Sequence, residues 1–130
     1  GTHMREQAMW RTWAEARNTT LVEGEDGVRP DGEWYLSIGQ GMGAAITVAD
    51  EKRCLTLSDL GTALFRSAEV DLTMLTFEDD AMVNPYSIIP LKGPHLEPAM
   101  ALQTFLLGDG SSLIAGHTVA GQPLFTPGQP

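Results

Sequence analysis

The clearest candidate for chemistry in this sequence is a glycine-rich turn that leads into a helical pattern. Gly39-Gln40-Gly41 is followed at once by apolar residues at helical spacing, beginning with Met42. The first N–H groups of a helix have no intrahelical acceptor and lie at the positive end of the helix dipole, and glycine lets an anion approach them closely. The turn therefore predicts an anion site built from backbone donors, although a Gly-x-Gly before a helix is more often only a tight turn.

Residues of the usual catalytic and metal-binding types are present but poorly arranged. The three histidines, which are far apart and lack metal-ligand spacing, are His3, His95 and His117. Cys54 precedes an apolar stretch and is expected to be a small buried hydrophobe. The acidic clusters at 50–51 and 78–80 lack the alternating oxygen-ligand spacing of a calcium loop, which favours solvated faces. The sequence therefore predicts no enzyme, no metal site and no cofactor.

Charge and length exclude several classes of protein. The 17 acidic and 8 basic side chains give a net charge of −9, and the basic ones are scattered, which disfavours nucleic acid and acidic membrane surfaces as partners. The 130 residues, 42% of them hydrophobic, suit one globular domain. No apolar run approaches the roughly 20 residues of a membrane span, and no signal peptide precedes the first helical pattern. The single cysteine excludes an internal disulfide.

The elements that would position the glycine turn are mostly helical. Five helices are expected, at 4–17, 41–52, about 58–66, 94–108 and 110–116. Thr2 is expected to cap the first helix. The apolar stripes expected to face inward are Met9, Trp10, Trp13 and Ala16 on the first helix, Met42, Ala45, Ile46 and Ala49 on the second, and Met100, Ala101, Phe105 and Leu106 on the fourth.

The rest of the chain contains strand and loop patterns. Residues 70–77 and 86–91 are rich in strand formers, with an acidic turn between them. Residues 18–30 are polar with two glycines and a proline, which favours a surface loop, and the proline-containing tail at 117–130 is expected to lie extended. The mixture indicates an α/β or α+β class.

Six short motifs occur in order and together nearly cover the chain. They are Gly-Thr-His at 1–3, Trp-Tyr-Leu-Ser-Ile-Gly-Gln-Gly-Met at 34–42, Ala-Asp-Glu-Lys at 49–52, Thr-Leu-Ser-Asp-Leu-Gly-Thr at 56–62, Asn-Pro-Tyr at 84–86 and Gln-Pro-Leu-Phe at 122–125. This series resembles the tungstate-binding proteins of ABC transporters, which are two-lobed extracytoplasmic proteins related to the molybdate binders. Departures from the family pattern are Ile38 in place of threonine, Leu60 in place of arginine and Ser87 in place of glycine.

The resemblance implies an oxyanion, tungstate or molybdate, held between two lobes by backbone N–H groups and hydroxyls. Thr2 matches the threonine of the family's Ser-Gly-Thr-His segment. The family's Gly-Gln-Gly-Met matches Gly39, Gln40, Gly41 and Met42. We predict these five residues as the ligand-binding set, within an α/β fold that forms part of a periplasmic-binding-protein architecture, its helices packed on a small mixed sheet.

The same resemblance assigns residues 1–86 to an oxyanion-binding domain like the family's second lobe, and 87–130 to a hinge strand and helices that would return to the first lobe. The first lobe would lie before residue 1, so we expect a truncated chain with weak affinity on its own. The opening Gly-Thr-His-Met is either native sequence in register with the family motif or the remnant of an expression tag.

The partners implied are the oxyanion and an ABC permease, in a periplasmic or extracytoplasmic location. The apolar side chains expected to lack cover without the first lobe are Ile88, Ile89, Leu91, Met100, Phe105, Leu106, Leu113, Ile114, Leu124 and Phe125. Because such faces favour self-association, we predict a homodimer. The alternative function is a non-transporting structural or interaction module that oligomerises through this C-terminal segment.

Overall fold

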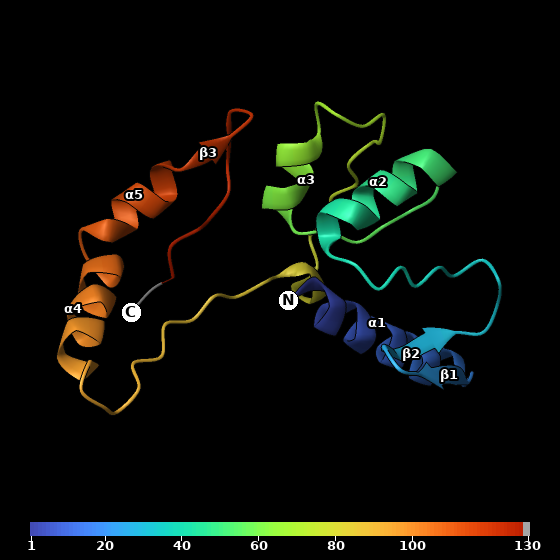
Figure 1. Ribbon diagram of the computed structural model, residues 1–130, viewed down its shortest axis with the longest axis horizontal. Coiled ribbons are helices and arrows are strands. Elements are labelled where there is room, and N and C mark those ends of the chain that lie inside the picture. Colours follow the sequence, from blue (N-terminus) through green and yellow to red (C-terminus); the bar gives the residue numbers. More distant parts are fainter. Residues whose placement is uncertain (129–130) are drawn as a thin grey trace. The chain divides into compact units, whose positions relative to one another are not determined.

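The computed structural model describes residues 1–128. Over these residues the chain is mixed α/β, with five α-helices, one short 3-10 helix and two separate two-stranded antiparallel sheets (Figure 1). The predicted α/β class is confirmed, and its β part consists of two hairpins rather than one mixed sheet. The chain divides into two compact units, residues 1–84 and residues 85 onward. The functional division predicted at 86 and 87 stays a prediction.

The first unit begins with a helix and a hairpin packed together. Helix α1 (Thr2–Arg17) is followed by strands β1 (Leu21–Gly24) and β2 (Gly27–Pro30), which pair antiparallel along their length beside the helix (Figure 1). The surface loop predicted at 18–30 is therefore wrong. The overlooked signal is Asp26-Gly27, because Asp-Gly between two strand-forming stretches is a strong hairpin signal, and Gly27 adopts a left-handed φ of 109°.

A buried glutamine joins α1 to β2. Gln7 is 5% exposed; its Nε2 donates to the Val28 carbonyl at 2.9 Å, and its Oε1 accepts from the Val28 N–H at 2.5 Å. The side-chain amide thus replaces the peptide group of a neighbouring strand, so the inner edge of β2 keeps its hydrogen bonds. A Cβ on Gly27 would collide with this amide. Close contact as well as backbone conformation therefore selects glycine there.

The inward face of α1 differs from the predicted apolar stripe. Ala14 is buried with Gln7, whereas Met9 is 36% and Trp13 40% exposed. The hairpin packs on the face of α1 that carries Gln7, because the Gln7 amide forms hydrogen bonds with the N–H and carbonyl groups at the edge of β2. The cap assigned to Thr2 is also wrong: Thr2 is the first helical residue, and the capping position belongs to Gly1.

Helices α2 (Met42–Lys52) and α3 (Leu60–Arg66) form the second part of the first unit and pack side by side (Figure 1). Ile46 and Ala49 are buried on α2, as its predicted stripe requires, and Leu64 is buried on the neighbouring α3. The Asp59 side chain caps α3 by accepting from the Thr62 N–H at 2.8 Å.

The strands predicted at 70–77 and 86–91 are wrong. Neither range contains strand in the structure, and only a 3-10 helix, Asp80–Met82, interrupts the intervening segment. Strand-forming residues need a partner that accepts and donates ladder hydrogen bonds, and the two described sheets consist of self-contained hairpins. Strand propensity without a partner strand leaves these segments without regular secondary structure.

The second unit contains α4 (Leu96–Leu107), α5 (Gly110–Gly116) and a minimal hairpin of β3 (Thr118–Val119) and β4 (Gln122–Pro123). The two helices pack against each other, and a Cβ on Gly110 would meet the ring and carbonyl of Phe105. The extended tail predicted at 117–130 is wrong over the hairpin, and its last two residues lie outside the described part of the chain.

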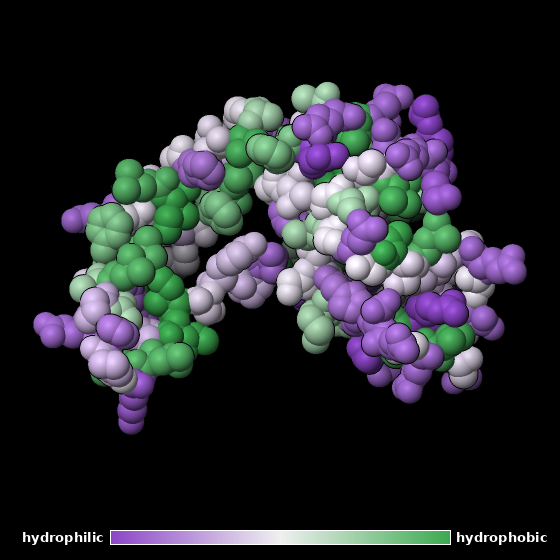
Figure 2. Space-filling model, viewed as in Figure 1, coloured by the Kyte–Doolittle hydropathy of each residue, from purple (hydrophilic) through white to green (hydrophobic). Residues whose placement is uncertain are grey.

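The surface of the second unit is rich in apolar side chains, and hydrophobic residues gather over its helices in Figure 2. The inward stripe predicted for α4 is wrong, since Met100 is 52% and Phe105 47% exposed. The unit offers α4 too little neighbouring structure to cover that face. Of the helices described, none has both the length and the apolar character needed to cross a bilayer.

Candidate functional site

The glycine turn is the N-terminus of α2, as predicted. Gly41 is the capping residue, with φ −74° and ψ 169°, and no side chain caps the helix. The first intrahelical bond runs from the Ala45 N–H to the Gly41 carbonyl at 3.1 Å. The N–H groups of the preceding three residues, 42–44, therefore have no acceptor within the helix and are the natural donors for an anion.

The glycines of this turn have different physical requirements. Gly39 has φ +60°, a left-handed conformation that favours glycine. Gly41 has an ordinary φ, and a Cβ on Gly41 or Gly43 would meet nothing within 4 Å. The backbone conformation therefore favours glycine at 39, whereas at 41 and 43 an added Cβ would meet no other part of the protein within 4 Å and would face only what approaches the helix end from outside.

Thr2 contacts the side chain of Met42, the first residue of this helix. Its Oγ1 donates to the Met42 Sδ at 2.6 Å, across 40 residues of sequence. The structure thus brings together two of the sequence-predicted site residues from separate helices, a hydroxyl at the start of α1 and the first residue of α2. Gln40 is exposed on the same turn. The groups so described are neutral: the first N–H groups of α2 have no acceptor within the helix, the Thr2 hydroxyl proton is donated to the Met42 sulfur, and the positive end of α2 is the electrostatic contribution.

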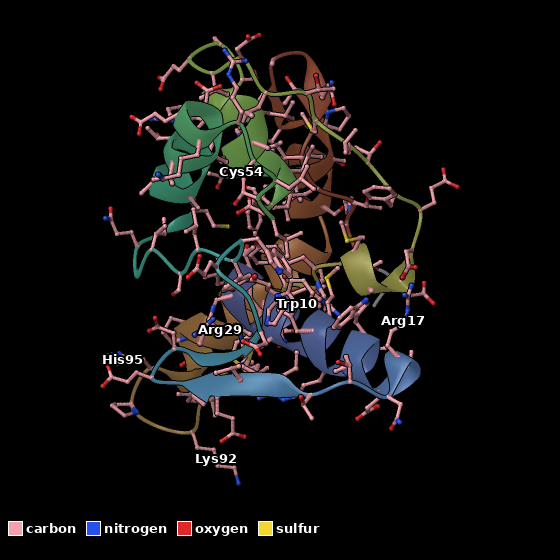
Figure 3. The ribbon with its side chains drawn as sticks, turned by 90° about the vertical axis from the view of Figure 1, so that its right-hand side faces the viewer. Trp10, Arg17, Arg29, Cys54, Lys92 and His95 are labelled. Carbon is pink, nitrogen blue, oxygen red and sulfur yellow. The ribbon has the colours of Figure 1, made fainter. Side chains whose placement is uncertain are left out.

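Tyr35 anchors the segment that leads to the turn. Its hydroxyl donates to Glu6 Oε1 at 2.7 Å, and Trp10 Nε1 donates to the same oxygen at 3.1 Å. The rings of Trp10, Trp34 and Tyr35 meet edge to face, with centroids 6.0–6.2 Å apart, around the labelled Trp10 of Figure 3. Burial, together with the hydrogen bond and negative charge of Glu6, raises the pKa of Tyr35 to about 12. The hydroxyl therefore stays protonated, and a donor, to a higher pH than that of an ordinary tyrosine.

The tip of the first hairpin also touches the site's neighbours. Ser37 Oγ donates to Asp26 Oδ2 at 2.9 Å, and His3 Nε2 lies 2.7 Å from the Asp26 carbonyl oxygen. Sequence reasoning gave no role to Asp26 or Ser37, and found only that His3 lacks the spacing of a metal ligand. The one usable signal was Asp26-Gly27, which marks a hairpin turn but does not say what the turn contacts.

The remaining candidates for chemistry stay apart. Cys54 is exposed between α2 and α3 (Figure 3), so the expectation of a buried thiol is wrong. His117 stacks on Phe125, and His95 starts α4 without capping it. Within residues 1–128, no three or more His, Cys, Asp or Glu side chains group in a way that would hold a metal ion.

Two shallow hollows lie outside the site. One, of about 420 Å³, is lined by residues 77–80 and 82–83 and so carries three carboxylates. The other, of about 360 Å³, lies between the end of α1 and the first hairpin. Neither includes the turn at 39–42, and the acidic lining of the first repels an anion.

Relatives with known names align over most of the chain. It is 33% identical to the tungstate-binding protein TupA of Peptoclostridium acidaminophilum, covering 98% of this chain and 43% of the relative. It is 38% identical to a protein of Haloferax volcanii named as an ABC transporter anion-binding protein, and 30% identical to TupA of Campylobacter jejuni. These two alignments cover 78% and 73% of this chain and 33% and 32% of the relatives.

The resemblance to the tungstate-binding proteins is confirmed. The chain spans less than half the length of the relatives that it matches. No family model and no solved structure matches it significantly. The likeness to tungstate-binding proteins therefore comes from sequence identity, and the geometry of the candidate site comes from this chain alone.

Proposed function

We propose that this chain binds a tetrahedral oxyanion, tungstate or molybdate, at the N-terminus of α2. The observation that carries the proposal is the uncapped helix end at Gly41, with the Thr2 hydroxyl beside it at Met42. The names of the relatives, two tungstate-binding proteins and one anion-binding protein of ABC transporters, support the ligand class. The ligand-binding residues of the proposal are Thr2, Gly39, Gln40, Gly41 and Met42.

Neutral donors suit this ligand in an acidic protein. A doubly charged oxyanion presents four acceptor oxygens, and each fixed N–H that replaces a water gains strength where water is excluded. The helix dipole adds attraction without a cationic side chain. Because the relatives are more than twice as long as the matched segment, affinity in this chain alone is expected to be weak.

Calorimetric titration with tungstate, molybdate and sulfate tests the proposal, with Gly41→Val as the decisive variant. Valine accepts the φ of −74°, and its Cβ would meet nothing within 4 Å, so the fold is expected to persist while the side chain blocks the helix end. We expect Gly41→Val to abolish binding, and Lys52→Ala and Arg53→Ala to change it little. Binding that survives Gly41→Val but disappears with either charge removal would contradict the backbone-donor mechanism.

The biological setting of the proposal is a substrate-binding component of an ABC transporter, extracytoplasmic, with a permease as its partner. The component carries out no catalysis and needs no cofactor. Residues 1–86 would form the binding domain and 87–130 the segment that leads to the rest of such a protein. Pull-down of a permease with oxyanion present and absent tests this setting separately from binding.

A second proposal is that the chain self-associates as a homodimer through the C-terminal unit, as a non-transporting interaction module. The exposure of apolar side chains favours it: Ile89 is 76%, Leu91 77% and Leu113 69% exposed. Sedimentation at micromolar concentration is expected to show a dimer that Leu113→Ser weakens. The control is Leu55→Ser, at an 88% exposed leucine of the first unit. A compact monomer would contradict this proposal and leave oxyanion binding unaffected.

A further inference from the structure

Three segments of the first unit meet at the tip of its hairpin. The Asp26 carbonyl accepts a hydrogen bond from His3 Nε2 at 2.7 Å, and the Asp26 carboxylate accepts from Ser37 Oγ at 2.9 Å. A carbonyl oxygen only accepts, so Nε2 is the protonated nitrogen of His3. The two bonds span 23 and 11 residues of sequence, and one residue therefore joins the start of α1 to the segment that leads into α2.

Both partners of Asp26 are neighbours of the proposed ligand-binding residues. His3 directly follows Thr2, and Ser37 stands two residues before Gly39. The contact between the Thr2 hydroxyl and the Met42 sulfur also joins the start of α1 to the start of α2. Asp26 thus contacts a residue that is close in sequence to each half of the site, the hydroxyl of α1 and the glycine turn of α2.

The segment between the hairpin and α2 depends on such side-chain anchors. Within 31–41, the described backbone makes one internal hydrogen bond, from the Tyr35 N–H to the Gly32 carbonyl at 3.4 Å. Its other described anchors are side chains: the hydrogen bonds of Tyr35 to Glu6 and of Ser37 to Asp26, and the ring contacts of Trp34 and Tyr35 with Trp10. Of these, the hydrogen bond from Ser37 lies nearest in sequence to the glycine turn. It is therefore expected to have the largest influence on the position of that turn.

We propose that Asp26 is a positioning residue for the oxyanion site, an inference that rests on the proposed function. Its carboxylate oxygen holds Ser37, and through Ser37 the turn at 39–41, so that the N–H groups of α2 converge with the Thr2 hydroxyl. The residue acts as a hydrogen-bond acceptor and does not touch the ligand. Its negative charge opposes an incoming anion, so the acceptor and the charge have opposite effects on binding.

These opposite effects make the proposal testable by substitution. Asp26→Ala removes acceptor and charge together, and Ser37→Ala removes the donor alone; both are expected to weaken tungstate binding by about 2–10-fold, the range of one hydrogen bond. Asp26→Asn keeps an acceptor oxygen and removes the charge, so it is expected to bind as well as the unchanged protein or better. Glu25→Ala is the matched control, because Glu25 lies on the same turn with the same charge.

The double variant Asp26→Ala/Ser37→Ala decides whether the two residues act through one bond. If they do, it binds no more weakly than either single variant, since the interaction is already lost. The proposal would be overturned if the loss of affinity in the double variant equalled the product of the two single losses. It would also be overturned if Asp26→Asn bound tungstate as weakly as Asp26→Ala, or if Asp26→Ala matched Glu25→Ala.

Hydrogen exchange without ligand separates this inference from the proposed function. Amides at 38–44 are expected to exchange faster in Asp26→Ala and Ser37→Ala than in Glu25→Ala or Asp26→Asn, whether or not the protein binds tungstate. If the unchanged protein fails to bind any oxyanion, the proposed function fails, and this exchange pattern still supports or overturns the positioning role. Equal exchange in all four variants would overturn it.

Discussion

The two units of this chain have similar secondary structure but different interiors. The buried apolar side chains of the described residues all lie in the first unit: they are Ala14, Val28, Ile46, Ala49 and Leu64. In the described part of the second unit only Gly110 is buried. Both units therefore contain regular helices, but only the first buries a small set of apolar side chains. A sequence can thus form helices without burying the apolar faces that stabilise them in a tertiary structure.

The side-chain hydrogen bonds of the described residues show the same contrast. In the first unit they join segments far apart in sequence, as in Gln7 with Val28 and Arg5 with the Val83 carbonyl at 2.5 Å. The second unit is held mainly by the packing of α4 on α5 and by rings, such as Tyr86 against Phe125. The candidate site lies in the unit whose polar contacts can fix its geometry.

The largest expected effect of this contrast is on hydrogen exchange. Amides of β2 and α2 are expected to exchange at least about 100-fold more slowly than those of α4 and α5, because opening the first unit exposes buried side chains and opening the second exposes few. Mass spectrometry of peptides from the two units measures this difference. Similar protection in both units would mean that the second is stabilised by something other than its own interior, such as a second copy.

The next effect concerns the buried amide of the first unit. Gln7→Ala is expected to destabilise it by about 3 kcal/mol, because the Val28 N–H and carbonyl lose their partners inside the protein. Trp10, Trp13 and Trp34 all lie in this unit, so tryptophan fluorescence during urea unfolding reports on it alone. Gln40→Ala, at an exposed glutamine, is the control. An unchanged midpoint for Gln7→Ala would show that water replaces the amide at little cost.

A smaller difference in stability is expected between variants at the N-termini of α3 and α5. Asp59 caps α3 through the Thr62 N–H and hydroxyl, whereas Asp109 precedes α5 without a side-chain cap. Asp59→Ala is expected to cost about 1 kcal/mol and Asp109→Ala close to nothing. Thermal unfolding followed by circular dichroism measures both. Equal losses would contradict the difference in capping between the units.

The smallest expected effect is a pH dependence confined to the first unit. The folded pKa of Tyr35, about 12, lies above its ordinary value of 10.0, so the protonated hydroxyl stabilises the fold. This contribution is complete below pH 10 and is lost as the pH rises toward 12. Tyr35→Phe is expected to flatten the alkaline decline in stability seen by tryptophan fluorescence, and Tyr86→Phe to leave it unchanged. An identical decline in Tyr35→Phe would rule out this tyrosine as its source.

The sequence by itself determined where the helices lie. The five predicted ranges agree with α1 to α5 to within a few residues, and α2 buries Ile46 and Ala49 as its periodicity requires. The start of α2 at the glycine turn was also predictable. Periodicity, capping and glycine turns depend on residues within about four positions of one another, so they can be recognised without knowing the tertiary structure.

Only the tertiary structure decided which faces are buried and which residues meet. A polar residue, Gln7, set the inward face of α1 because it pairs with the edge of β2, while strand formers at 70–77 stayed without a partner strand. Thr2 beside Met42, and Asp26 between His3 and Ser37, depend on contacts across 11 to 40 residues. Such convergence results from the packing of whole elements, and no local pattern in the chain specifies it.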